Sequence, residues 1–256
     1  MYKNIIIGKK VVLFDLDGTI VNNEPMWQLA FSNVMSREGI YLEAYKELVR
    51  ASGVPNSLKW NSILQTIQPK SGKTSEQLTK DTSDEYLKIL EESEMETRDG
   101  FWDLVFFLKQ EKGFKLGLVT NSGKEVAEKI LVKVGISETF DFKVFGDDVK
   151  KLKPDPETYK TALKLAGASA KEALAFEDSP TGAAAAENAG IDLIVIWDGV
   201  TSKGLFPQET IFFLQDFEGL ANNLELTFEE AFRDFQKTVL QTPEEDVSQQ
   251  TQKQPR

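Results

Sequence analysis

A series of short, mostly apolar runs, each followed at once by acidic or small polar residues, most constrains how this chain can fold. The first run, Val11 to Phe14, leads into Asp15-Leu16-Asp17-Gly18-Thr19. Four more runs have the same character, at residues 115–119, 142–145, 173–176 and 193–197. Runs of this kind are typical of strands that are buried on both faces of a sheet.

Helical patterns separate these runs. Apolar residues recur at helical spacing across residues 124–134, 156–166 and 181–189, and a glycine follows each segment. Strands that alternate with helices predict a parallel sheet with helices on both faces, which is a doubly wound, Rossmann-like α/β fold. Because ligands bind at the carboxyl ends of the strands in such folds, the polar residues after the runs are candidate site residues.

Between the first two runs, strands and helices do not alternate, and the sequence pattern is helical throughout. We expect helices at residues 26–35, 41–51, 58–67 and 75–92, with no strand among them. This predicts an α/β core from residues 1–20 and 99–240, and an all-helical cap from residues 21–98 that could close over the acidic loops. A last core helix is expected at 227–240, and the polar residues 241–256 are expected to form a disordered tail.

The chain contains no cysteine and no histidine. Disulfides, thiolate metal sites, serine–histidine triads and histidine-bound zinc are therefore excluded. Any chemistry must use carboxylates, lysines, hydroxyls, amides and a bound metal.

The formal net charge of −11 argues against a nucleic-acid partner, because the chain offers no broad basic face. No apolar run approaches the roughly 18 residues that span a bilayer, so we expect no membrane segment. We expect a cytoplasmic protein, and a cap that must open and close favours a monomer. An anionic substrate would need local cations to draw it in against the global field.

Two pairs of acids stand at predicted strand ends. Asp15 and Asp17 lie two apart, and two carboxylates held close together are costly unless a cation neutralises them. Mg²⁺ prefers oxygen ligands and suits phosphate chemistry. Taken alone, this pair fits an ordinary polar turn equally well. The adjacent acids Glu177 and Asp178 follow a buried run, which favours a metal site over a structural role.

Four segments together resemble the four signature motifs of the haloacid dehalogenase superfamily, in the expected order. They are Phe14-Asp15-Leu16-Asp17-Gly18-Thr19, Thr120-Asn121-Ser122, Lys153-Pro154-Asp155-Pro156 and Glu177-Asp178-Ser179-Pro180-Thr181-Gly182. The resemblance runs from about residue 10 to residue 200. The helical insert is similar to the cap of the branch that holds beta-phosphoglucomutase and many small-metabolite phosphatases.

The resemblance implies an aspartyl-phosphate mechanism. Asp15 would attack phosphorus, and water would then hydrolyse the intermediate. Asp17 would protonate the leaving oxygen and later deprotonate the water. Mg²⁺ would be held by Asp15, Asp178 and the backbone carbonyl of Asp17, with Glu177 as a further ligand or a group behind the ligands.

The remaining motif residues would hold the phosphoryl group. Thr120, with Asn121 and Ser122, would bind its oxygens, although this segment also suits a helix N-cap and the two roles are compatible. Lys153 would neutralise the nucleophile and the phosphoryl group, and the hydroxyl of Thr19 would contribute to binding. Lys153 is distinguished from a surface lysine only by its place before Pro154.

Simple hydrolysis of a small phosphorylated metabolite, such as a sugar phosphate, is the function that these motifs favour. The alternative is a phosphomutase, but those enzymes carry a cap histidine near Trp27 and an arginine within the stretch that matches residues 53–57, and both are missing here. A non-catalytic phosphate-binding regulator is disfavoured by the complete motif set, and a dehalogenase by Asp17. Trp27 and Trp60 could line a substrate pocket or fill the core of the cap.

Overall fold

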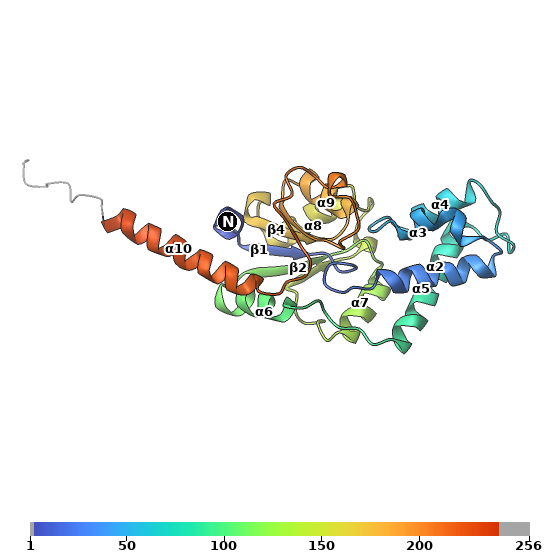
Figure 1. Ribbon diagram of the computed structural model, residues 1–256, viewed down its shortest axis with the longest axis horizontal. Coiled ribbons are helices and arrows are strands. Elements are labelled where there is room, and N and C mark those ends of the chain that lie inside the picture. Colours follow the sequence, from blue (N-terminus) through green and yellow to red (C-terminus); the bar gives the residue numbers. More distant parts are fainter. Residues whose placement is uncertain (1–2, 241–256) are drawn as a thin grey trace, which may run out of the picture.

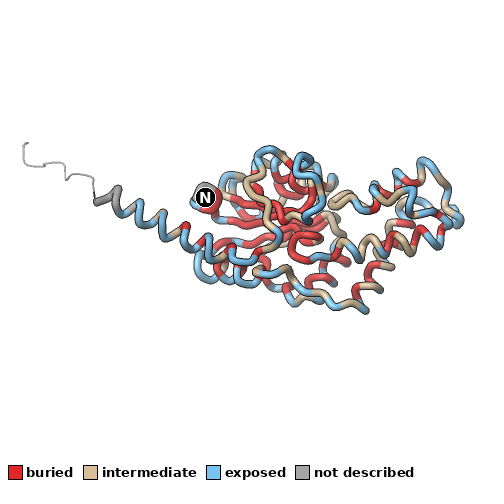
Figure 2. Tube along the Cα trace, in the orientation of Figure 1, coloured by how far each residue is buried: buried red, intermediate tan, exposed pale blue. Residues whose placement is uncertain are grey.

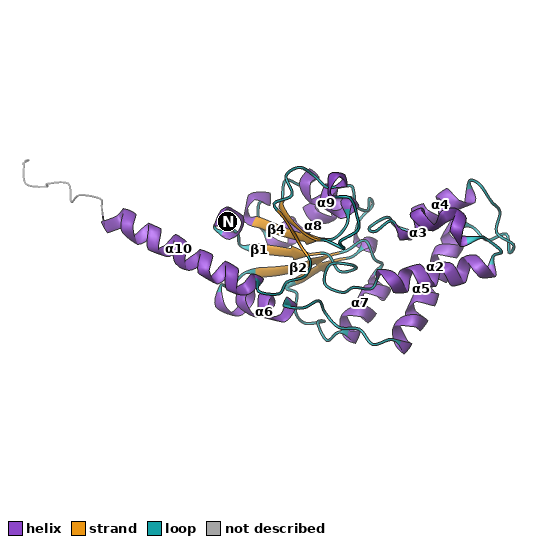
Figure 3. Cartoon of the chain, in the orientation of Figure 1, coloured by secondary structure: helices purple, strands orange, loops and turns teal. Residues whose placement is uncertain are grey.

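The computed structural model describes residues 3–240, so the tail predicted at 241–256 lies outside the described residues. Six parallel strands form one sheet in the order β3-β2-β1-β4-β5-β6. Figure 3 shows strands of this sheet in orange with helices around them. The strands are β1 (Val11–Phe14), β2 (Lys115–Val119), β3 (Phe142–Val144), β4 (Ala173–Glu177), β5 (Asp192–Ile196) and β6 (Phe212–Leu214). The predicted Rossmann-like parallel sheet is confirmed.

Helices cover both faces of this sheet because successive residues of each strand point to opposite sides. In β1, Val12 and Phe14 pack into one apolar cluster, while Val11 and Leu13 pack into another, and all four are buried. Figure 2 shows that buried residues are concentrated in the region of the sheet. The first cluster includes residues of α6 (Phe101–Phe106), α7 (Lys124–Lys133) and α10 (Leu220–Leu240), and the second includes residues of α8 (Glu157–Ala166) and α9 (Pro180–Asn188). The short α1 (Lys3–Ile6) contacts α10.

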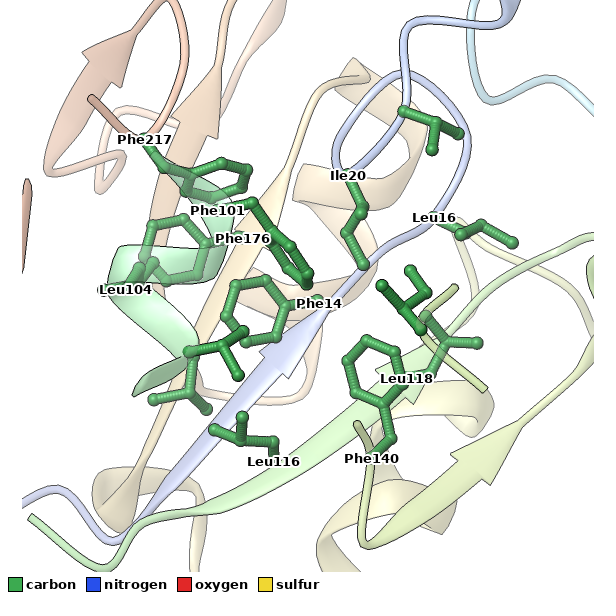
Figure 4. Packing of buried hydrophobic residues seen from close by; sticks show 14 of the residues in the cluster. Phe14, Leu16, Ile20, Phe101, Leu104, Leu116, Leu118, Phe140, Phe176 and Phe217 are labelled. Carbon is green, nitrogen blue, oxygen red and sulfur yellow. The ribbon is translucent and has the colours of Figure 1, made fainter. Parts of the chain in front are cut away.

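Four phenylalanine rings pack behind the strand ends that carry the acidic residues (Figure 4). Phe14 of β1 stacks on Phe176 of β4 with ring centroids 5.1 Å apart. Phe101 and Phe217 pack edge-on against Phe14, at 5.7 and 6.0 Å. Because Phe14 and Phe176 directly precede Asp15 and Glu177, this packing holds the acids in place.

Residues 24–92, in the first part of the connection between β1 and β2, form a helical unit at one end of the molecule, beyond the carboxyl ends of the strands (Figure 1). Its helices are α2 (Glu24–Arg37), α3 (Lys46–Arg50), α4 (Asn56–Leu64) and α5 (Ser75–Glu92), and residues 24–92 contain no strand. The unit has its own apolar core, which includes Phe31, Trp60, Ile63 and Leu78. Trp60 is fully buried there, so it fills this core and does not line a pocket.

Several details of the elements differ from the prediction. The sixth strand, β6, was missed because its run of three residues is too short to show a pattern, and α1 and α6 were also missed. Residues 41–51 form a 3₁₀ turn followed by α3, with a break at Tyr45. The last helix begins at Leu220 rather than 227, because burial of Leu220 and Leu224 outweighs the weak helix propensity of the two asparagines between them.

Candidate active site

The register of the sheet brings three of the predicted motifs to one edge. Phe14 of β1 pairs with Leu118 of β2 on one side and with Phe176 of β4 on the other. Asp15 therefore follows the central strand beside Glu177, and its backbone N–H donates to the Phe176 carbonyl at 3.0 Å. The connection from β3 to β4 crosses β2 and β1, so the strand order reverses between β1 and β4. Ligands usually bind at the carboxyl ends of the strands beside such a reversal.

Lys153 lies at the centre of the site and is almost completely buried. Its Nζ donates to Asp15 Oδ1 at 2.7 Å, to Glu177 Oε1 at 2.6 Å and to the Val119 carbonyl at 2.7 Å. Burial alone would lower the pKa of Lys153, but the Asp15 and Glu177 carboxylates outweigh it and hold that pKa above its usual value. All three ammonium donors are thus used within the protein, and the lysine stays charged.

Glu177 is held from two sides. Its Oε1 also accepts a hydrogen bond from the Tyr159 hydroxyl of α8 at 2.7 Å. Its Oε2 is buried and has no hydrogen-bond partner. A Cβ at residue 182 would lie 2.0 Å from Oε2, so only glycine leaves room for this carboxylate at the start of α9. Tyr159 was not singled out in the sequence, although a tyrosine on the buried face of a predicted helix needs a polar partner.

Asp178 completes a cluster of three buried carboxylates. Oxygen atoms of Asp15, Glu177 and Asp178 lie within 4.8 Å of one another. Burial raises the pKa of Asp15 to about 8, with Lys153 opposing the shift and the neighbouring acids adding to it. Burial, Asp15 and Glu177 together raise the pKa of Asp178 well above its usual value. One lysine therefore does not neutralise the cluster, and oxygen ligands in this number suit a hard divalent cation.

The loop that carries Asp15 and Asp17 approaches Asp178 closely. Gly18 has a φ of +81°, and a Cβ there would lie 2.2 Å from Asp178 Oδ2. The Arg98 guanidinium donates from Nε and Nη2 to the Gly18 carbonyl at 3.0 and 2.7 Å, which braces the loop. Asp178 Oδ1 accepts from the Thr19 hydroxyl at 3.4 Å, and Asp178 Oδ2 accepts from Ser52 of the helical unit at 2.7 Å.

The Asp17 carboxylate is not part of this cluster and accepts hydrogen bonds from four side chains. Its Oδ1 accepts from Asn23 Nδ2 at 2.6 Å and from Trp27 Nε1 at 3.0 Å. Its Oδ2 accepts from the hydroxyls of Ser122 at 2.6 Å and Thr120 at 3.4 Å. The two oxygens therefore differ, because Trp27 can only donate, whereas the hydroxyls can also accept.

A cavity of about 220 Å³ lies between these loops and the helical unit. Residues of the strand-end loops line one wall, and residues of α2, α4, α5 and the 53–57 loop line the other. The two walls touch, since a Cβ at Gly53 would lie 2.2 Å from the Ser179 hydroxyl. The predicted residues that line the cavity are Asp15, Asp17, Thr120, Asn121, Ser122, Lys153 and Asp178.

Residues 12–196 match the haloacid dehalogenase-like hydrolase family. The chain belongs to this family. The resemblance seen in the four motifs is thereby confirmed, and the match covers most of the sheet and the whole helical unit.

Curated relatives of this hydrolase are phosphatases. It is 32% identical over 182 residues to the validoxylamine A 7'-phosphate phosphatase of Streptomyces hygroscopicus subsp. limoneus, covering 71% of this chain and 83% of that protein. It is 30% identical over 187 residues to the phosphorylated carbohydrates phosphatase of Thermotoga maritima, covering 72% and 83%. These relatives confirm the predicted enzyme class, a haloacid dehalogenase-like phosphatase.

The fold of the hydrolase is shared with CbbY from Rhodobacter sphaeroides, solved as a mutant in complex with xylulose-(1,5)bisphosphate. The TM-score is 0.71 at 24% sequence identity, over 82% of this chain and 95% of that one. A putative beta-phosphoglucomutase from Thermotoga maritima is similar at a TM-score of 0.67 and 25% identity, over 84% and 98%. Among the residues that the structure describes in this hydrolase, no helix is both long and apolar enough to cross a bilayer.

Two of the predicted site residues, Glu177 and Thr19, do not line the cavity. Glu177 is behind Lys153, and Thr19 is fully buried with its hydroxyl directed at Asp178. Thr19 is thus placed to support a carboxylate and not to touch a substrate. Trp27, which the sequence left open as a pocket or core residue, lines the cavity. Glu24 and Lys59 of the helical unit also line it, and no motif identified them.

Proposed function

We propose that this hydrolase is an Mg²⁺-dependent phosphatase that cleaves a small phosphate monoester through an aspartyl-phosphate on Asp15. The observation that carries the proposal is the 2.7 Å contact between Lys153 Nζ and Asp15 Oδ1 inside a buried carboxylate cluster. A charged lysine on one oxygen orients the carboxylate and offsets negative charge. The names of the relatives support a phosphorylated carbohydrate or a similar polyhydroxyl ester as substrate.

The residues present fit a magnesium ion. Three buried carboxylates with a single lysine among them offer hard oxygen ligands and an excess of negative charge. Asp15 and Asp178, with the backbone carbonyl of Asp17, would hold the ion. Bound there, Mg²⁺ would offset negative charge on the carboxylates and on the phosphoryl group. Glu177 Oε1 is already shared by Lys153 and Tyr159, which favours a supporting role for Glu177.

In the first step, Asp15 forms a bond to phosphorus and the ester oxygen leaves. Lys153 occupies Oδ1 of Asp15, which leaves Oδ2 as the attacking atom. In the second step, a water oxygen bonds to phosphorus and the bond to Asp15 breaks, so inorganic phosphate is released. Thr120, Asn121 and Ser122 precede α7 and would bind the phosphoryl oxygens at its N-terminus.

Asp17 is placed to move the proton in both steps. Because Asn23 and Trp27 donate to Oδ1, the proton of a neutral Asp17 belongs on Oδ2, beside the hydroxyls of Thr120 and Ser122. Oδ2 would protonate the leaving alkoxide and then accept a proton from the attacking water. The hydroxyls can reverse their hydrogen bonds as the proton leaves and returns, whereas a donor such as Trp27 cannot.

The test is phosphate release from a panel of phosphate monoesters with Mg²⁺, run beside an Asp15→Asn variant and an EDTA control. We expect release from at least one ester, and none with the variant or EDTA. If no ester is hydrolysed, or if the variant equals the wild type, the proposal fails. Movement of phosphate between two carbons of one sugar would instead identify a phosphomutase. The core and cap boundaries, the cytoplasmic location and the monomeric state remain predictions.

A further inference from the structure

Lys59 of α4 is a buried cation on the wall that the helical unit contributes to the cavity. It is 4% exposed, and its Nζ donates to the Val49 carbonyl at 2.9 Å and lies 5.6 Å from the centre of the Phe31 ring. No ion pair within 4.0 Å reaches Lys59 from any residue that the structure describes. An ammonium group has three donors, so two are left without a protein acceptor, which is unfavourable in a buried site.

Glu24, the first residue of α2, lines the same cavity and is the nearest source of opposite charge. Its Oε1 lies 3.3 Å from the Ser52 hydroxyl, whose single proton is directed at Asp178 Oδ2 at 2.7 Å. Burial lowers the pKa of Lys59 and raises that of Glu24, and each group opposes the shift of the other. The two side chains thus interact electrostatically on one wall of the cavity but form no ion pair within 4.0 Å.

Thr79 of α5 is a third polar residue of this wall, and its hydroxyl has no partner among the residues that the structure describes. It lines the cavity, yet its hydroxyl oxygen is buried and has no hydrogen-bond partner. Buried polar atoms in proteins are nearly always paired, so an unpaired hydroxyl and an ammonium group with unused donors on the lining of one cavity favour a ligand with polar atoms there. The neighbouring side chains Asn56, Ser57 and Ser83 add further hydroxyl and amide groups.

We propose that Lys59, Glu24 and Thr79 form a subsite for the hydroxyl groups of the non-reacting part of the substrate, which makes the preferred ester a polyol or sugar monophosphate. The inference rests on the proposed function. A hydroxyl can accept from Lys59 and donate to Glu24 at once, so it can bridge two groups that do not meet. A second phosphate at this end would gain Lys59 but would face Glu24, in a cavity already lined by Asp15, Asp17 and Asp178.

The experiment compares kcat/KM for glucose 6-phosphate and sorbitol 6-phosphate with that for ethyl phosphate, which carries the same reacting group and no hydroxyls. The variants are Lys59→Met, which keeps the length of the side chain, and Thr79→Val, which keeps its shape. Because a lost hydrogen bond to a charged group is worth about 1.5–3 kcal/mol, Lys59→Met should lower the ratio of polyol to ethyl ester by at least about tenfold, mainly through KM. Thr79→Val should lower it by about threefold or more.

Two controls separate recognition from folding. Lys9→Met removes another buried lysine, which pairs with Asp192 at 2.6 Å and does not line the cavity, and it should leave the ratio unchanged. Thr79→Val removes an unpaired hydroxyl, so its thermal midpoint should equal or exceed that of the wild type while KM for the polyol ester rises. If Lys59→Met fails to fold, Thr79→Val still carries the test.

Three outcomes would overturn the inference. The first is an equal loss for ethyl and polyol esters, or no loss for either. The second is a Lys59-dependent preference for fructose 1,6-bisphosphate over the monophosphates, which would assign Lys59 to a second phosphate. The third is hydrolysis of ethyl phosphate with no gain for polyol esters, which would leave the proposed phosphatase function intact. Failure to hydrolyse any ester would remove both.

Discussion

The two walls of the cavity differ in how completely their charged groups are partnered. On the core wall, Lys153 uses all three donors on Asp15, Glu177 and the Val119 carbonyl, and Asp17 accepts from four side chains. On the wall of the helical unit, Lys59 has one hydrogen-bond acceptor, and the Thr79 hydroxyl has no partner. Both lysines are nevertheless buried, at 3% and 4% exposure.

In the proposed function, the fully partnered groups are those that react, and the partly partnered groups are those that bind the rest of the substrate. Groups that must hold one geometry during phosphoryl transfer are oriented in advance by the protein, and pre-organised charge is effective because nothing has to rearrange during the reaction. Groups that bind the rest of a substrate keep free donors until the substrate arrives. The following predictions test this contrast, from the largest expected effect to the smallest.

Removal of the nucleophile should have the largest effect. Asp15→Asn should lower kcat by about a thousandfold or more, because an amide cannot form the covalent intermediate, and the residual rate reports positioning alone. Initial rates of phosphate release measure this, with circular dichroism to verify folding. Asp103→Asn, an exposed acid on α6, should keep full activity. A wild-type rate for Asp15→Asn would refute its assigned role.

The two buried lysines should differ in their contribution to stability. Lys153→Met leaves Asp15 and Glu177 buried without their cation, and such a loss typically costs about 3–5 kcal/mol of unfolding free energy. Lys59 forms no ion pair with a carboxylate of any residue that the structure describes, so Lys59→Met should lower the unfolding free energy by less than Lys153→Met does. Urea unfolding in EDTA compares the two, with the exposed Lys151→Met as a neutral control. Equal losses for Lys153 and Lys59 would contradict the contrast between the walls.

The carboxylate cluster should make both stability and metal affinity depend on pH. Burial raises the pKa of Asp15 from 3.8 to about 8, and that of Asp178 moves in the same direction. Between these values the folded, metal-free protein binds protons that the unfolded chain has released, so its unfolding free energy should fall as pH rises from about 4 to about 8. Mg²⁺ requires the ionised carboxylates, so its affinity should rise over the same range.

Thermal midpoints in EDTA and with Mg²⁺, taken at several pH values, measure both effects. Asp15→Asn is the matched control, because it removes one titrating group from the cluster and should flatten the pH dependence. If Mg²⁺ raises the midpoint equally at all these pH values, the carboxylate cluster is not its site.

The smallest effect is expected for Tyr159, which is buried behind Glu177 and does not line the cavity. Tyr159→Phe removes only the hydroxyl that donates to Glu177, which should cost about 1 kcal/mol of unfolding free energy and lower kcat several-fold, since Lys153 still holds the same oxygen. Tyr41→Phe, at an exposed tyrosine, should change neither quantity. A loss of activity as large as that of Lys153→Met would show that Tyr159 does more than support Glu177.

The core wall could be predicted because its residues stand at fixed positions after buried strands. In a parallel sheet, strand ends meet at one edge, so Asp15, Thr120 and Asp178 were expected together, and their approach in the structure agrees. Tyr159 was missed because its contact with Glu177 depends on how α8 packs on the sheet. The hydrogen bonds from Asn23 and Trp27 to Asp17 Oδ1 were not predicted, because they depend on the direction of α2 relative to the loop that carries Asp17.

The sequence by itself determined the fold class, the family and the positions of the candidate reacting groups, since these follow from local periodicity and from short motifs. Only the tertiary structure decided what faces those groups. Glu24, Lys59 and Thr79 come from three different helices, and no local pattern relates them. They share one wall because the apolar core around Trp60 sets the angles between α2, α4 and α5, and Gly53 lets that unit rest against Ser179.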